Sequence, residues 1–193
     1  VDSLESCRVE QVWKGGRLVA RNGKLCSKPG KSFFIGTTTS PPPVDAESIR
    51  VVAPADKKKI RVIGWNEGSL LTESLCLEPL IEKGYVVADP AQDVVKVIVQ
   101  ERNRNTGRVA VGFVKGLGLK FGALGASVAH DAHPYIVAGV DEPSILRALA
   151  WLRENGGGLV ACVGERILAT LPLPIGGLMS DSPPEEVAAA LRN

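Results

Sequence analysis

The residues of this chain best suited to chemistry lie in the run Ala129-His130-Asp131-Ala132-His133, which holds both histidines of the sequence and a carboxylate. Histidine titrates near neutral pH, so its imidazole can move a proton or bind a ligand. The run follows a glycine-rich stretch and precedes the apolar segment at residues 135–140, which places it where strands meet. His130, Asp131 and His133 are therefore the candidate catalytic residues.

The spacing of the two histidines disfavours a shared metal ion. In an extended segment His130 and His133 point to opposite faces, because side chains alternate along a strand. A helix would bring them to one face, but Pro134 disfavours helical geometry at the residue before it. We therefore expect no metal site in this chain. Two roles stay open: the histidines face a substrate, or one of them joins Asp131 in satisfying buried strand ends.

A glycine-rich run, Gly116-Leu-Gly-Leu-Lys-Phe-Gly122, supplies the next candidates. It resembles a phosphate-binding loop, in which a backbone amide such as that of Gly118 approaches an anion and Lys120 adds charge. Its spacing fits neither the Walker motif nor the dinucleotide fingerprint. A tight turn or sheet corner explains the glycines more economically, and nucleotide binding stays an alternative.

Lys96 and Arg102 are further candidates for substrate binding, on or next to an apolar strand. Lys96 interrupts a run of valines and isoleucine, and a charge in that setting usually faces outward. If Lys96 points inward it must be paired, because an isolated buried ammonium is very costly. Asp93 or Glu101 would then be the expected partner.

Composition limits the class of protein. The chain has 193 residues, 45% hydrophobic content and a net charge of +2, enough for one ordinary domain plus an appendage. No apolar run approaches 20 residues and no signal peptide is recognisable, so we expect a soluble, cytoplasmic protein that does not span a membrane. The only basic cluster, at residues 57–59, lacks interleaved aromatics, so nucleic-acid binding is not expected. Four scattered cysteines without CxxC spacing favour reduced, mostly buried thiols.

The order of turns and apolar runs predicts the domain organisation. Alternation and glycine turns predict a small antiparallel meander in residues 1–28. Prolines and threonines predict a linker at residues 29–45, and residues 46–193 form the main domain.

Within the main domain, strands outnumber helices. Residues 49–52 and 60–65 are strand candidates, and residues 69–83 are left unassigned. Two hairpins are expected, residues 93–101 with 109–115, and residues 159–163 with 166–171. Asp141 caps a helix that ends at the glycines 156–158, and Ser182-Pro-Pro-Glu185 is a capping box for a short terminal helix. The fold class is therefore α+β, with a mainly antiparallel sheet and a few flanking helices.

Taken together, several segments resemble one family, the adenine deaminases of the metal-dependent amidohydrolase superfamily, in their C-terminal region. The resembling segments are Val9 to Leu25, Asp93-Val-Val-Lys96, Gly107, Gly112 to Leu119, His130 to His133, Gly156 to Gly158, and Leu173 to Asp181. The first is similar to the β-sandwich tail that follows an amidohydrolase barrel, and the remainder resembles the domain that adenine deaminases append.

The resemblance implies a function for a larger enzyme. That enzyme would hydrolyse adenine to hypoxanthine and ammonia with a binuclear divalent metal centre, manganese or iron, in a barrel domain that this sequence lacks. This chain alone is expected to be inactive. Its own contribution would be substrate enclosure and docking to the barrel, with His130, Asp131 and His133 in an accessory role. The expected partners are the barrel domain, a purine and further copies of the protein.

The sequence departs from the family pattern at three positions. Asn103, Ala132 and Pro134 stand where the family commonly has His, Ser and Asn. The competing interpretation is a non-catalytic assembly module or a sensor of small ligands such as nucleotides. The apolar segment Leu173–Met179 is either a packed loop or an interface strip.

Overall fold

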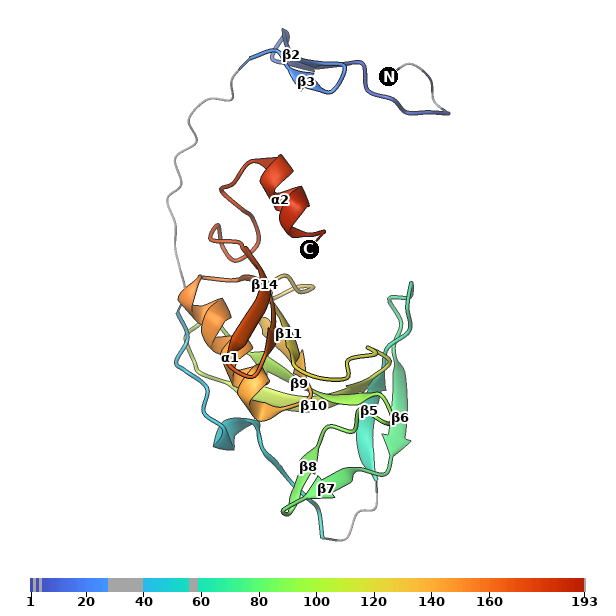
Figure 1. The fold of residues 1–193 in the computed structure, drawn as a ribbon, viewed down its shortest axis with the longest axis vertical. Coiled ribbons are helices and arrows are strands. Elements are labelled where there is room, and N and C mark those ends of the chain that lie inside the picture. The colour runs from blue at the N-terminus through green and yellow to red at the C-terminus, as the bar shows by residue number, and fades with distance from the viewer. Residues whose placement is uncertain (2, 4, 28–39, 56–58, 193) are drawn as a thin grey trace. The chain divides into compact units, whose positions relative to one another are not determined.

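The computed structural model describes residues 1, 3, 5–27, 40–55 and 59–192 (Figure 1). The chain forms two compact units, Val1–Ile35 and Gly36–Asn193. The bounds expected from the sequence, 1–28, 29–45 and 46–193, stay predictions. Residues 29–39 of the expected linker and two lysines of the basic cluster, Lys57 and Lys58, lie outside the described residues.

The first unit contains the expected meander. Strands β1 (Gln11–Lys14), β2 (Arg17–Arg21) and β3 (Lys24–Leu25) pair antiparallel in sequence order. The turn at Gly15 and Gly16 and the turn at Asn22 and Gly23 have positive φ angles, which these residue types adopt at low cost.

The second unit is built on an eight-stranded sheet of order β14-β13-β11-β12-β9-β10-β5-β6. Its strands are β5 (Ile60–Gly64), β6 (Glu73–Leu77), β9 (Val94–Gln100), β10 (Val109–Lys115), β11 (Ala123–Ala126), β12 (Tyr135–Gly139), β13 (Gly158–Val163) and β14 (Arg166–Pro172). Neighbouring strands pair antiparallel except β10 and β5, which are parallel. The expected α+β class with a mainly antiparallel sheet is confirmed.

One face of this sheet is covered by the 3-10 helix η1 (Glu47–Ile49), a small sheet of β4 (Val51–Val52), β8 (Tyr85–Val87) and β7 (Leu80–Glu82), and helix α1 (Glu142–Glu154). Helix α2 (Pro184–Ala190) contacts β14, and its end lies at the other face. Helix α1 packs on β11, β12 and β13 (Figure 1). Two buried clusters fill the covered face, one under α1 around Ile98 and Leu152, the other around Val86 and Phe113.

Most local predictions for this unit are confirmed. The hairpins β9–β10 and β13–β14 form as expected. Asp141 caps α1, where its Oδ1 accepts a hydrogen bond from the Ser144 amide at 2.8 Å. Ile145, Leu149 and Leu152 bury the apolar stripe of the helix.

Three local predictions are wrong. Ile49 belongs to η1 and not to a strand, because its amide donates to the Ala46 carbonyl at 3.3 Å within the helical turn, and β4 begins only at Val51. The capping box fails, since Pro183 occupies the N-cap of α2 and no side chain caps the helix. Three of the four cysteines, Cys7, Cys26 and Cys76, are exposed, so only Cys162 fits the expectation of buried thiols. The unassigned residues 69–83 contain β6 and β7.

Candidate functional site

The histidine run connects β11 to β12, as its expected place between strands required. It is neither extended nor helical. Residues 130–132 form a turn, and Asp131 and His133 have φ angles of 63° and 45°. Histidine and aspartate tolerate this left-handed conformation better than most residues. Strand alternation therefore does not set the directions in which His130 and His133 point.

The two histidines have different surroundings. The side chains of His130 and Asp131 are 96% and 88% exposed, and the His130 Nδ1 lies 3.2 Å from the Asp131 Oδ1. His133 is half-buried, and its Nδ1 accepts a hydrogen bond from the Ala129 amide at 3.3 Å. The turn thus presents one exposed imidazole beside a carboxylate, while the other imidazole stabilises the turn.

These side chains do not fit a binuclear metal centre. In residues 1, 3, 5–27, 40–55 and 59–192, no three histidine, cysteine or acidic side chains gather as metal ligands. The Nδ1 lone pair of His133 is already used by a backbone amide, and His130 has only Asp131 beside it. We therefore derive no chemical step through a metal held by this chain.

Arg102 and Asn103, which directly follow β9, anchor the turn through its backbone. The Arg102 Nε donates to the His133 carbonyl at 2.6 Å, and the Asn103 Nδ2 donates to the Ala132 carbonyl at 2.6 Å. Asn103, which stands where the family commonly has histidine, thus stabilises the turn through its side-chain amide. The histidine turn is held in place by the end of the central strand.

Arg102 also joins this turn to a second loop, at residues 173–179. Its Nη2 donates to the Gly176 carbonyl at 2.6 Å, and its Cζ lies 5.5 Å from the centre of the Tyr135 ring. The residue is only 5% exposed. Among the described residues no carboxylate forms an ion pair with it, so carbonyl dipoles and an aromatic face compensate its charge.

Gly177 and Tyr135 complete the surroundings of Arg102. Gly177 has a φ of +72°, and a Cβ there would lie 2.6 Å from the guanidinium. Tyr135 is fully buried, and burial raises the pKa of its phenol while the positive charge of Arg102 opposes the shift. This packing requires the small residue at position 177 and leaves little freedom to the loop.

Ser127 fastens the same loop from the end of β11. Its hydroxyl donates to the Gly177 carbonyl at 2.5 Å and accepts from the Gly158 amide at 2.7 Å. The side chain is fully buried. In the segment Leu173–Met179, Leu173 is buried and Met179 is exposed. The packed-loop interpretation therefore holds at Leu173, and the interface interpretation stays a prediction.

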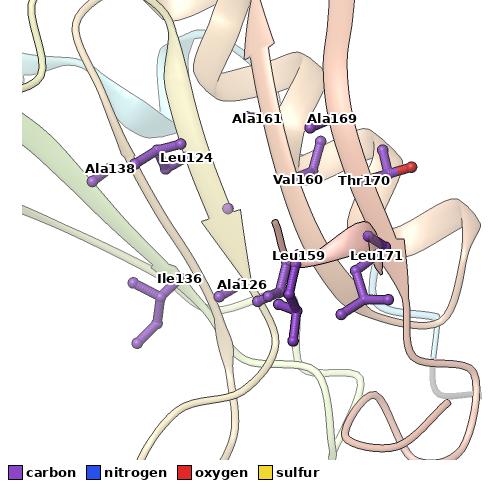
Figure 2. A pocket seen from close by; sticks show the side chains of 13 residues that line it. Leu124, Ala126, Ile136, Ala138, Leu159, Val160, Ala161, Ala169, Thr170 and Leu171 are labelled. Carbon is purple, nitrogen blue, oxygen red and sulfur yellow. The ribbon is translucent and has the colours of Figure 1, made fainter. Parts of the chain in front are cut away.

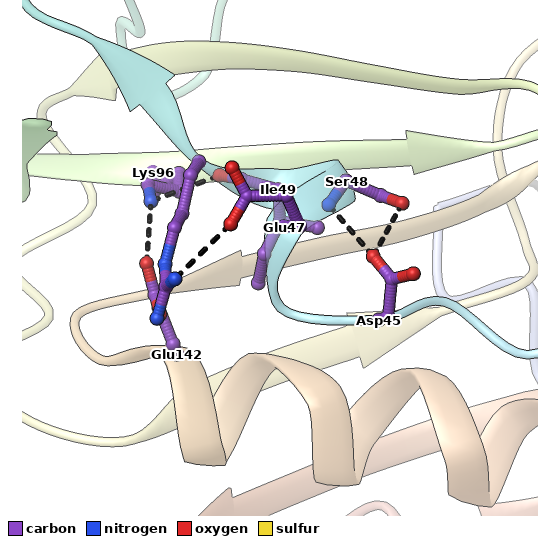
Figure 3. A network of polar contacts seen from close by, with 7 residues as sticks. Asp45, Glu47, Ser48, Ile49, Lys96 and Glu142 are labelled. Atoms are coloured by element: carbon purple, nitrogen blue, oxygen red, sulfur yellow. Dashed lines mark hydrogen bonds and ion pairs between the residues drawn. The ribbon is translucent and has the colours of Figure 1, made fainter.

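Lys96 points inward, against the outward orientation expected from alternation (Figure 3). It is 3% exposed, and its Nζ donates to the Ile49 carbonyl at 3.0 Å and lies 3.6 Å from the Glu142 Oε1. Burial lowers the pKa of Lys96, and the negative charge of Glu142 opposes the shift. The expected partners Asp93 and Glu101 are wrong, because Glu142 at the start of α1 supplies the carboxylate.

The glycine-rich loop uses its donors within the chain. The Gly118 amide donates to the Asp93 Oδ1 at 2.8 Å, and the Lys120 Nζ donates to the Pro90 carbonyl at 2.9 Å. Gly116 and Gly122 have positive φ angles, and a Cβ at either position would collide with a backbone carbonyl. These contacts agree with a sheet corner.

Apart from Lys96, which lies within β9, the candidate residues fall into two groups at opposite ends of this strand. Arg102 and the histidine turn lie beyond its carboxyl end, whereas Gly118 and Lys120 bond to residues just before its amino end. Seven residues of strand span about 23 Å. The structure does not bring the two groups together, and the substrate-binding roles of Lys96, Arg102, Gly118 and Lys120 stay predictions.

An apolar hollow of about 500 Å³ lies on the other side of the sheet from α1 (Figure 2). Side chains from β11, β12, β13 and β14 line it, together with Ala190 and Leu191 at the end of α2. Sequence reasoning missed this hollow and the loop contacts of Ser127 and Tyr135. The adjacent glycines 176 and 177 were the available signal for a close backbone approach.

Comparison with known proteins relates the chain to one family. The model of the adenine deaminase C-terminal domain matches residues 69–193. An adenine deaminase of Oleidesulfovibrio alaskensis is 43% identical over 193 residues, which is 100% of this chain and 33% of the relative. Adenine deaminase 2 of Carboxydothermus hydrogenoformans is 38% identical over 98% of the chain and 33% of the relative. An adenine deaminase of Methanothrix thermoacetophila is 42% identical over 96% of the chain and 32% of the relative.

The chain thus spans about a third of the length of the curated relatives it matches. None of the helices in the described ranges is long and apolar enough to cross a membrane. The matched residues begin in the loop between β5 and β6 and continue beyond α2, so they include the histidine turn, Arg102 and the apolar hollow. On this evidence the chain belongs to the adenine deaminase C-terminal domain family.

Proposed function

We propose that this chain is the C-terminal region of an adenine deaminase, where it docks on a separate catalytic domain and helps to enclose the substrate. The complete enzyme would hydrolyse adenine to hypoxanthine and ammonia. Curated relatives named adenine deaminase, of which the chain spans a third, support the proposal. The binuclear metal centre that the family resemblance implies would take its ligands from the barrel domain, and no three ligand side chains gather in the described part of this chain.

The observation that carries the local role is the anchored histidine turn. Its imidazole at His130 is 96% exposed, yet the backbone below it is fixed by Arg102 and Asn103. A solvent-facing side chain needs no such anchoring for its own sake, whereas a group that meets a substrate in a neighbouring domain must be held in position. The His130 Nδ1 lies 3.2 Å from the Asp131 Oδ1, so the carboxylate helps to orient the exposed ring.

His130→Ala in the complete protein tests this role. We expect a loss of about tenfold or more in kcat/KM for adenine, the effect of removing a positioned proton donor, with an unchanged melting temperature because the side chain is exposed. Glu78→Ala, an exposed residue in the β6–β7 turn, is the matched control and should change neither quantity. Unchanged kinetics in His130→Ala would refute the accessory role.

The competing nucleotide-binding module finds no support in the loop at Gly116–Gly122. The Gly118 amide and the Lys120 ammonium are already bound to Asp93 and Pro90. A cytoplasmic location, a purine ligand and association into homo-oligomers stay predictions.

A further inference from the structure

The sheet face opposite α1 carries two rows of apolar cross-strand neighbours. The strand registers place one row at Ala161, Leu124, Ala138, Val97 and Gly112. They place the second row at Leu159, Ala126, Ile136, Val99 and Ala110. We call these ten positions, on five adjacent strands, the open face. It contains no polar or charged side chain, and none of its members is buried.

The side chains of β9 are not distributed as in a sheet with one face in water. In such sheets apolar residues face the core and polar residues face water. Here the polar residues of β9, Lys96 and Gln100, point into the covered face, where they are 3% and 1% exposed. The apolar Val97 and Val99 point into the open face. The strand is therefore suited to burial on both sides.

From this pattern we infer that the open face is a docking surface for a convex, apolar element, such as a helix, in the other two thirds of the same polypeptide. The inference rests on the proposal that the chain belongs to a longer enzyme. The first support is length, because the chain covers only 32–33% of the relatives named above. A contiguous apolar surface of this kind marks an interaction site in soluble proteins.

The shape of the open face favours a convex occupant over a second copy of this chain. The hollow of about 500 Å³ runs over Leu124, Ile136 and Leu159, and the end of α2 forms one wall (Figure 2). A two-fold contact would place one hollow opposite an identical hollow and leave both unfilled. A helix laid on the sheet fills the hollow and completes a layer on the side of the sheet opposite α1.

The chemistry of the rows supports the same occupant. Alanine and glycine supply five of the ten positions, so the backbone of a partner can approach closely, while Leu124, Leu159 and Ile136 supply the larger apolar contacts. A partner must be apolar where it meets the rows, because a charged group there would lose its water without gaining an ion pair. The specificity of the contact therefore comes from shape.

Cysteine labelling in the complete protein tests the docking surface. Ala138→Cys and Ala161→Cys place a thiol on the open face with little change in size, and Val52→Cys is the control. Val52 is 72% exposed on β4, in the small sheet that packs on the covered face. Maleimide labelling is followed by peptide mass mapping, which separates these sites from the exposed native cysteines 7, 26 and 76.

We expect each open-face cysteine to react at least tenfold more slowly in the complete protein than in the 193-residue chain alone, whereas Val52→Cys should react at the same rate in both. In the 193-residue chain alone the rates should not depend on protein concentration. Open-face rates that are equal in the complete protein and in the chain alone would overturn the inference. Protection that appears in the 193-residue chain and grows with concentration would also overturn it, because a second copy would then be the occupant.

The labelling does not depend on turnover, so it separates this inference from the proposed function. A protected open face in a protein that does not deaminate adenine would refute the proposed activity and support the docking surface. A reactive open face in an active adenine deaminase would do the reverse.

Discussion

Replacement of Arg102 by alanine tests whether one buried guanidinium holds the two loops of the candidate site together. The side chain donates to the His133 and Gly176 carbonyls, both at 2.6 Å, and stacks on Tyr135. A hydrogen bond from a charged donor contributes a net ~1.5–3 kcal/mol, so the two bonds amount to about 3–6 kcal/mol. The substitution also removes the desolvation penalty of the buried guanidinium, and this offsets part of the lost hydrogen-bond free energy.

We therefore expect Arg102→Ala to lower the free energy of unfolding by about 3 kcal/mol. In a chain of this size that corresponds to a fall of roughly 6–12 °C in Tm. Thermal and urea unfolding of the 193-residue chain measure it. Arg104→Ala is the matched control, because Arg104 is exposed two residues further on and should change stability by less than about 0.5 kcal/mol.

Hydrogen exchange locates the effect. The Ala129 amide, which donates to His133, and the Met179 amide, which donates to Ile175, should both exchange faster in Arg102→Ala. Amides paired between β13 and β14 should keep their relative protection. A loss of stability below about 1 kcal/mol, or faster exchange in only one of the two loops, would refute the view that Arg102 couples them.

Three further changes test other parts of the structure. Burial lowers the pKa of Lys96 below its usual 10.5, so the unfolded chain binds this proton more tightly than the folded chain. The free energy of unfolding should therefore rise as the pH rises from the folded pKa towards 10.5. Urea titrations measure this rise, and Lys96→Met should remove it. Gly122→Ala would push a Cβ into the Cys162 carbonyl, whereas a Cβ at Gly118 meets open space and costs only about 1–2 kcal/mol for the φ of +67°. Gly122→Ala should therefore lower Tm clearly more than Gly118→Ala. Equal effects would contradict the close approach at Gly122. Ser127→Ala leaves the Gly158 amide and the Gly177 carbonyl without the hydroxyl that binds both. The free energy of unfolding in denaturant should therefore fall by about 2–4 kcal/mol. An unchanged free energy would mean that water replaces the hydroxyl.

Local patterns in the sequence were sufficient for the elements whose signals lie within a few residues. The run from Val94 to Gln100 and its partner strand β10 are rich in β-branched residues on both sides of a turn, so their pairing needs no distant contact. The cap at Asp141 and the stripe of α1 are similarly local, because helix periodicity and capping depend on residues three and four positions apart. The family resemblance rested on several short blocks in order, and the match to residues 69–193 confirms it.

Long-range packing decided what the local patterns left open. The sequence places Lys96 on one face of β9, but only Glu142 and the Ile49 carbonyl, 46 and 47 residues away, make that face a tolerable place for a charge. The parallel pairing of β5 with β10 and the order of the eight strands are likewise set by contacts between distant segments. The histidine turn depends on Arg102 and Asn103, which are 31 and 29 positions from the carbonyls they bind.

The open face shows the division most clearly. The sequence by itself determined which residues alternate along each strand, because side chains in a strand point to opposite faces with a period of two. Only the tertiary structure decided that apolar residues from five strands fall into two continuous rows on a face that α1 does not cover. Registers between strands are fixed by the packing of the whole sheet, since a slip of one residue would exchange its two faces.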